Sequence, residues 1–167
     1  MKNTFVISCP IDCYSGYSAR SRDLVKAIIA LDKYDVKILP QRWGSTPWGF
    51  IEDHPEWSFL NNHLFQPQPN QQYPAPDIWV QITIPNEFVK QGRYNIGITA
   101  GIESTLAPAD WVEGCNRMDL VLGSSNHSID VLKNSRYQKH DKNTNQAIGS
   151  IELNTKTDIL FEGLNLN

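Results

Sequence analysis

The first forty or so residues most constrain the fold of this chain. Thr4–Cys9 is rich in β-branched and aromatic residues, which predicts a short buried strand that Pro10 ends. After a turn rich in Ser, Gly and Tyr, apolar residues recur at helical spacing over Ser18–Asp32, with Ser18 as a suitable N-cap. Tyr34–Leu39 then predicts a second strand. A strand, a helix and a strand in this order form a βαβ unit, which implies a parallel sheet.

The same alternation continues after a long connection, residues 41–76. This connection holds three tryptophans and many of the prolines, and one short helix is expected near residues 56–64; connections of this length are often functional. The later segments are expected strands at 77–84, 93–99, 118–123, 148–153 and 157–161, helices at 108–117 and 125–133, and a solvated loop at 139–146. The pattern predicts one Rossmann-like α/β domain over residues 1–167, with a doubly wound, mainly parallel sheet and helices on both faces.

Composition and charge argue against several classes of protein. The 167 residues carry a net charge of −3, which gives a nucleic-acid role no support. No run of 18 apolar residues exists, so no transmembrane segment is predicted, and the N-terminal apolar stretch is too short for a secretory signal. Three cysteines, an odd number, do not form a closed disulfide framework. We therefore expect a cytoplasmic protein.

The turn between the first strand and the first helix is the first candidate site. In doubly wound sheets, ligands bind outside the carboxyl ends of the strands. Gly16 would let the backbone approach a ligand there, and a helix N-terminus favours anionic groups. Arg20 and Arg22 lie in the first helical turn, where cations are locally unfavourable, which indicates an anionic partner. In the alternative interpretation Gly16 only supplies an unusual backbone angle and both arginines are solvated.

Two further segments follow predicted strands and meet the same edge of the sheet. Glu103, just past Gly101, could accept a hydrogen bond from a sugar hydroxyl or act as a general base. Its alternative is a surface glutamate that caps the helix beginning near Pro108. Ser125 is a predicted N-cap, and Asp119 is interpreted as a turn residue. No histidine or cysteine has metal-ligand spacing, so no metal site is predicted.

The tryptophans have two interpretations. Trp79 lies within a predicted strand and is expected in the core. Trp43, Trp48 and Trp57 lie in the long connection, where they either fill the core, which we prefer, or form stacking platforms for sugars.

Four stretches of this sequence together resemble the N-terminal half of GT-B glycosyltransferases of the group 1 type found in phage and bacterial genomes. They are SGYSARSRDLVKAI, PDIWVQITIPNEF, IGITAGIEST and WVEGCNRMDLVLGSSNHSIDVL, and they span most of residues 4–133. The tail, DILFEGLNLN, is similar to the segment where such enzymes leave their first domain. The resemblance implies two Rossmann-like domains with the active site between them. The N-terminal domain mainly holds the acceptor, and a C-terminal domain, expected to be absent from this chain, holds most of the nucleotide-sugar donor.

The resemblance also implies roles for particular residues. Its Gly-rich loop, expected to reach the donor phosphates or the acceptor, corresponds to Ser15, Gly16 and Tyr17, with Ser-Gly in place of the family's frequent Gly-Gly. Many members carry a histidine after the fourth strand, which is replaced here by the Thr99–Glu103 segment, so Glu103 becomes the catalytic candidate. The predicted substrate-binding residues are Ser15, Gly16, Tyr17, Arg20, Thr99, Gly101, Ser124 and Ser125.

These inferences lead to one prediction and two alternatives. The prediction is the acceptor-side domain of a hexosyltransferase-type glycosyltransferase, inactive alone because catalysis requires both reactants to be positioned. It would use a nucleotide sugar as substrate and no cofactor. The first alternative is a non-catalytic glycan- or protein-binding α/β module, and the second is a flavodoxin-like nucleotide binder. If a second domain normally packs on this one, the apolar surface left exposed could drive self-association.

Overall fold

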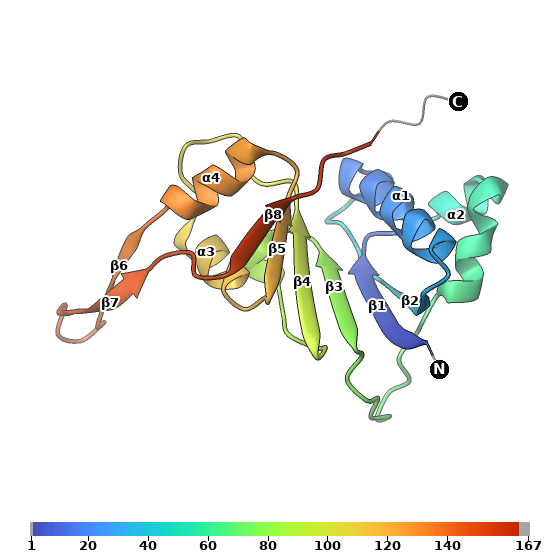
Figure 1. Ribbon diagram of the computed structural model, residues 1–167, viewed down its shortest axis with the longest axis horizontal. Helices are drawn as coiled ribbons and strands as arrows, with labels where there is room; N and C mark the ends of the chain where they lie inside the picture. Colours follow the sequence, from blue (N-terminus) through green and yellow to red (C-terminus); the bar gives the residue numbers. More distant parts are fainter. Residues whose placement is uncertain (1, 164–167) are drawn as a thin grey trace. The chain divides into compact units, whose positions relative to one another are not determined.

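The computed structural model describes residues 2–163 and has an α/β fold, in which helices flank a β-sheet (Figure 1). The six-stranded sheet is parallel throughout and has the order β2-β1-β3-β4-β5-β8. Its strands are β1 (Asn3–Cys9), β2 (Tyr34–Pro40), β3 (Ile78–Ile82), β4 (Tyr94–Thr99), β5 (Leu120–Gly123) and β8 (Lys156–Ile159). This is the Rossmann-like, doubly wound architecture that the alternating segments predict. The described residues form two compact units: unit 1 contains residues 2–83 and 91–95, and unit 2 contains residues 84–90 and 96–163.

In unit 1 the predicted βαβ unit is confirmed. β1 pairs in parallel with β2 on one side and with β3 on the other, and α1 (Gly16–Ala30) packs against β1 and β2. The predicted N-cap is wrong, because α1 begins earlier than expected. Ser15 has the extended backbone that a cap requires, and its Oγ accepts a hydrogen bond from Ser18 N at 3.1 Å. Ser18 is instead a buried residue of the first helical turn.

The long connection folds into two short helices, α2 (Phe50–Asp53) and the 3₁₀ helix η1 (Pro55–His63). Trp79 on β3 is buried, as predicted. The core interpretation of the three loop tryptophans is wrong. Trp43 and Trp57 are half-buried and Trp48 is 40% exposed, because the connection lies over the loop after β1 rather than inside the sheet packing.

In unit 2 two glycines allow close packing on one face of the sheet. Gly97 on β4 pairs with Val121, and Thr99 pairs with Gly123 on β5, so both glycines point to the same face. A Cβ at Gly97 would lie 2.5 Å from the Phe88 ring. One at Gly123 would lie 2.8 Å from Ile129. The packed elements are η2 (Pro85–Glu87), α3 (Ala109–Cys115) and α4 (Asn126–Asn134).

An antiparallel hairpin, which we call the arm, projects beyond α3 and α4 in unit 2 (Figure 1). It consists of β6 (Tyr137–His140) and β7 (Ala147–Ile151). The predicted loop at 139–146 is therefore wrong at its start, where Lys139 and His140 belong to β6. Asp141 closes the arm's turn, and hydrogen bonds from Asn143 N and Thr144 N hold the pKa of its carboxyl below the ordinary value.

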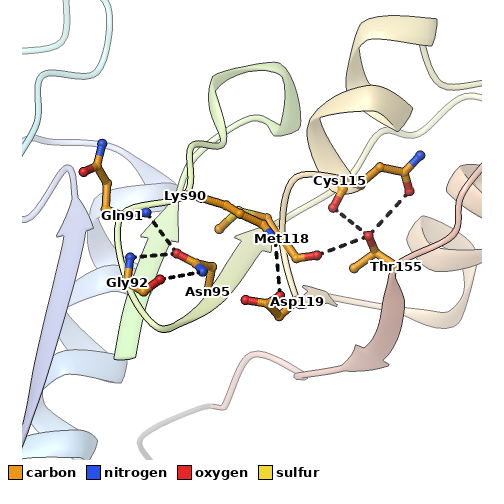
Figure 2. Close-up of polar contacts among 9 residues, drawn as sticks. Lys90, Gln91, Gly92, Asn95, Cys115, Met118, Asp119 and Thr155 are labelled. Carbon is orange, nitrogen blue, oxygen red and sulfur yellow. Dashed lines mark hydrogen bonds and ion pairs between the residues drawn. The ribbon is translucent and has the colours of Figure 1, made fainter. Parts of the chain in front are cut away.

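Figure 2 shows the polar contacts at the amino ends of β5 and β8, both in unit 2. Asp119, just before β5, forms an ion pair with Lys90 at 3.4 Å. Thr155, just before β8, donates its hydroxyl to the Cys115 carbonyl at 2.9 Å and lies 3.3 Å from the Met118 carbonyl. Asp119 is thus at the end of β5 opposite to Ser124 and Ser125, consistent with a turn residue.

Candidate functional site

Gly16 is the first residue of α1 and leaves the helix N-terminus open. Its backbone φ lies outside the left-handed region, so the interpretation that it supplies an unusual backbone angle is wrong. A Cβ added at Gly16 would meet no heavy atom within 4 Å. Protein atoms therefore leave space beside Gly16 at the start of α1, and a helix N-terminus favours anionic groups.

Arg22 has a structural role that the sequence did not reveal. Its side chain is 5% exposed, and Nη1 donates to the carbonyls of Ile11 and Cys13, both at 3.0 Å. The guanidinium carbon lies 3.4 Å from the centre of the Phe50 ring. Arg22 is therefore neither solvated nor free to meet an anionic ligand, so both interpretations of it are wrong. Arg20 is half-buried and stays a predicted ligand contact.

Aromatic side chains gather around the start of α1. Tyr17, in the first helical turn, stacks on Trp43, with ring centres 4.2 Å apart and an interplanar angle of 24°. In the same loop the guanidinium of Arg42 lies 5.3 Å from the centre of the exposed Trp48 ring, a cation–π contact. We call Tyr17, Trp43 and Trp48 the aromatic platform. It lies at the carboxyl ends of β1 and β2, where this class of sheet binds ligands.

Backbone hydrogen bonds fix the loop that carries the platform. The Asp12 carbonyl accepts from Gly49 N at 3.0 Å and from Phe50 N at 3.1 Å, and the Asp12 carboxylate accepts from Ile51 N at 2.7 Å. Cys13 and Trp48 form an isolated antiparallel bridge. A loop held at this many points presents its aromatic rings in one arrangement, which lowers the entropy cost of binding.

Gln41 was not singled out in the sequence, yet it joins two strands of unit 1 at their carboxyl ends. Its Nε2 donates to the Ile82 carbonyl at 2.8 Å, and its Oε1 accepts from Ser8 Oγ at 3.2 Å. No local pattern marks such a residue, because both partners are distant in sequence.

In unit 2 the loops after β4 and β5 lie together, as predicted. The Ala100 carbonyl accepts from Ser124 Oγ at 2.7 Å and from Ser128 Oγ at 2.8 Å. Ser125 is the N-cap of α4, as predicted, and its Oγ accepts from Ser128 N at 3.1 Å. These serines therefore join the β4 loop to the start of α4.

The loop after β4 is tightly built at its base and open at its tip. Gly101 has a φ of +89°, and a Cβ there would lie 2.4 Å from Ser128 Cβ, so no other residue fits without movement. Thr99 is fully buried, and its hydroxyl accepts from Gly101 N at 3.3 Å. Glu103 is exposed beyond them. It does not cap α3, whose N-cap is Pro108 with no side-chain bond, so the capping interpretation is wrong.

The predicted site residues thus fall into two groups. Unit 1 brings together Ser15, Gly16, Tyr17 and Arg20, and unit 2 brings together Thr99, Gly101, Glu103, Ser124 and Ser125. Two contacts were not predicted from the sequence: Tyr17 stacks on Trp43, and the Arg42 guanidinium makes a cation–π contact with Trp48. The concentration of aromatic residues in the long connection was the available signal.

The cysteines offer a chemical test of the packing. Burial raises the pKa of the Cys9 thiol to about 12 and that of Cys115 to about 12. We expect both to resist alkylation at pH 8 in the folded protein, and to react once denaturant unfolds it, as followed by mass spectrometry. Unfolded thiols titrate near 8.5. Between that value and about pH 12 the folded state retains protons that the unfolded state releases, so the free energy of unfolding should fall as pH rises through this window. Rapid native alkylation of Cys9 would contradict its burial.

Comparisons of the chain with protein-family models, curated proteins and solved structures found no match. Over residues 2–163, no helix is both long and apolar enough to cross a membrane. The proposed function therefore rests on the chemistry of the site.

Proposed function

We propose that this chain is the acceptor-side domain of a glycosyltransferase that transfers a sugar from a nucleotide sugar. The aromatic platform is the observation that carries the proposal. Sugar rings present patches of C–H groups that pack on aromatic faces, and a rigid platform with few rotatable bonds binds them at low entropy cost. Tyr17 and Trp43 supply such faces next to the helix N-terminus at Gly16.

The start of α1 adds a second recognition element to the platform. Ser15 accepts the hydrogen bond of Ser18 N, and the Ser15 carbonyl accepts that of Ala19 N. Helical geometry leaves the N–H group of Gly16, the first residue of α1, without an intrahelical partner. Such a group, reinforced by the helix dipole, binds phosphate or sugar hydroxyl oxygens. In the proposal it holds a phosphate of the donor or a hydroxyl of the acceptor.

Glu103 is the proposed general base. It is an exposed carboxylate on a loop whose base is held by Gly101 and the α4 serines. A carboxylate in such a position can take the proton of an acceptor hydroxyl as that oxygen bonds to the anomeric carbon of the donor sugar and the nucleotide leaves with its phosphate oxygen. As the resemblance implies, a second domain would supply most donor contacts.

A non-catalytic glycan-binding module is the second candidate function. The observation that favours it is that the platform lies entirely within unit 1 and needs no catalytic carboxylate. In this reading the protein binds glycans and not nucleotide sugars, and Glu103 has no effect.

Glycan binding measured by calorimetry or NMR tests the platform. We expect Trp43→Ala to weaken binding about tenfold, since losing an aromatic contact removes about 1.4 kcal/mol. Trp57→Ala is the matched control, because Trp57 is also half-buried but stacks with Phe59 on η1, and it should bind as the parent does. Equal binding by parent and Trp43→Ala would contradict the platform.

Glu103→Gln separates the two functions. In a glycosyltransferase assayed with its donor domain, this substitution should lower the transfer rate by about 10²–10⁴-fold and leave glycan binding unchanged. Suppose instead that the protein binds glycans but no nucleotide sugar, and that Glu103→Gln changes neither glycan binding nor transfer. That result would contradict the glycosyltransferase proposal and support the glycan-binding module.

A further inference from the structure

Unit 2 contains a polar cavity of about 510 Å³ that belongs to neither group of predicted site residues. It lies between the C-terminal end of α3 and the base of the arm. The residues that line it include Glu113, Arg117, Lys139, Ser150, Ile151 and Glu152. Because Arg117 precedes β5, this wall of the cavity is on the amino side of that strand, whereas Ser124 and Ser125 follow its carboxyl end.

The charges that line this cavity balance. Glu113 and Lys139 form an ion pair at 3.2 Å. Arg117 donates to two backbone carbonyls, with Nε 2.6 Å from Phe88 O and Nη2 2.7 Å from Asn86 O. Glu152 supplies the second carboxylate. Two carboxylates face two cations, so a ligand with net charge would gain little from the cavity as a whole.

Glu152 has the most available hydrogen-bonding capacity. It is half-buried, and across residues 2–163 its carboxylate makes no hydrogen bond or ion pair. The backbone around it is fixed: Asn116 Nδ2 donates to the Glu152 carbonyl at 2.7 Å, and Asn116 Oδ1 accepts from Asn154 N at 2.8 Å. The backbone of this segment is therefore fixed beside the cavity, and within the described residues the acceptor oxygens of Glu152 have no protein partner.

We propose that this cavity binds a neutral sugar unit. Glu152 and the second oxygen of Glu113 accept hydrogen bonds from adjacent sugar hydroxyls, Lys139 donates to another, and Ile151, on the same face of the arm as Lys139, packs on the C–H face of the ring. Its volume is in the range of about 300–1,000 Å³ of small-molecule sites. A balanced set of donors and acceptors matches a ligand that carries many hydroxyls and no charge. The site would anchor a glycan without taking part in sugar transfer. This inference holds whether or not the protein is part of a glycosyltransferase.

Backbone amide chemical shifts test this site during titration with neutral methyl hexosides. We expect saturable shifts at Ser150, Ile151 and Glu152, and about tenfold weaker binding in Glu152→Gln, which keeps the shape but loses a charge-assisted acceptor. Ser150→Ala should bind as the parent does, because the register places Ser150 opposite Gln138, on the other face of the arm from Lys139 and Ile151. Glu56→Gln, an exposed glutamate on η1, is the matched control and should bind as the parent does.

Three results would overturn the proposal. They are the absence of saturable shifts at these amides, unchanged affinity in Glu152→Gln, and tighter binding of glucuronate or glucosamine than of the neutral hexosides. The platform is tested separately, because Trp43→Ala should abolish only the shifts near α1. Loss of one set of shifts and retention of the other shows which proposal has failed.

Discussion

Replacing Gly114 by alanine is expected to destabilise unit 2 by more than about 3 kcal/mol, a large fraction of the stability of an ordinary domain. Gly114 lies in α3 where this helix packs on η2, and a Cβ there would lie 1.8 Å from the Pro85 carbonyl oxygen and 2.5 Å from its carbon. Both neighbours are backbone atoms, so no change of rotamer can relieve the overlap, and helix and loop must move apart. Urea unfolding followed by circular dichroism measures the loss.

Gly16→Ala is the matched control for this prediction. Both positions are helical glycines, but Gly16 has no heavy atom within 4 Å of the added Cβ. We expect its free energy of unfolding to stay within about 1 kcal/mol of the parent value, because the added methyl meets no atom and alanine restricts the unfolded chain. Equal stability of the two variants would contradict the close packing of α3 on Pro85.

Arg22→Met is expected to reduce the free energy of unfolding by about 3 kcal/mol. The substitution preserves much of the side-chain volume but removes the donor shared by the Ile11 and Cys13 carbonyls, and it ends the contact of the guanidinium with Phe50. Two buried carbonyls left without this donor each carry a desolvation penalty of about 1–3 kcal/mol. Thermal and urea unfolding give the magnitude.

The loop should respond as well as the overall stability. Cys13 is bridged to Trp48, so releasing the Cys13 carbonyl should loosen the platform and raise amide exchange across residues 46–50. Arg20→Met, at a half-buried position two residues earlier, should have the smaller effect on both measurements. An Arg22→Met variant as stable as Arg20→Met would show that the carbonyl contacts contribute little.

The strands and helices were largely predictable because their signals are local. β1, α1 and β2 follow from β-branched runs and helical spacing within about forty residues, and β5 with α4 follows from an apolar run and a serine cap. The N-cap of α1 was not decidable in this way. Ser15 and Ser18 are both suitable caps, and only the extended backbone at Ser15 distinguishes them.

The arm shows a different limit. β7 overlaps the strand predicted at 148–153, but β6 is exposed on nearly every residue, and neither alternation of apolar and polar residues nor a buried run marks it. β6 exists through pairing with β7, in which Tyr137 lies opposite Ile151, a partner beyond the turn. Cross-strand pairing of this kind is not encoded in either segment alone.

By itself, the sequence determined the class of fold and the loops in which we predict a site, because hydrophobic periodicity and turn residues act over short distances. The tertiary structure decided which residues in those loops are available. It buried Arg22 under Phe50 and the carbonyls of the β1 loop, set Trp43 on Tyr17, and left Glu103 exposed. The first two outcomes depend on contacts between residues in different segments of the chain, such as Arg22 with Phe50 and Tyr17 with Trp43, and such contacts exist only once the chain has folded.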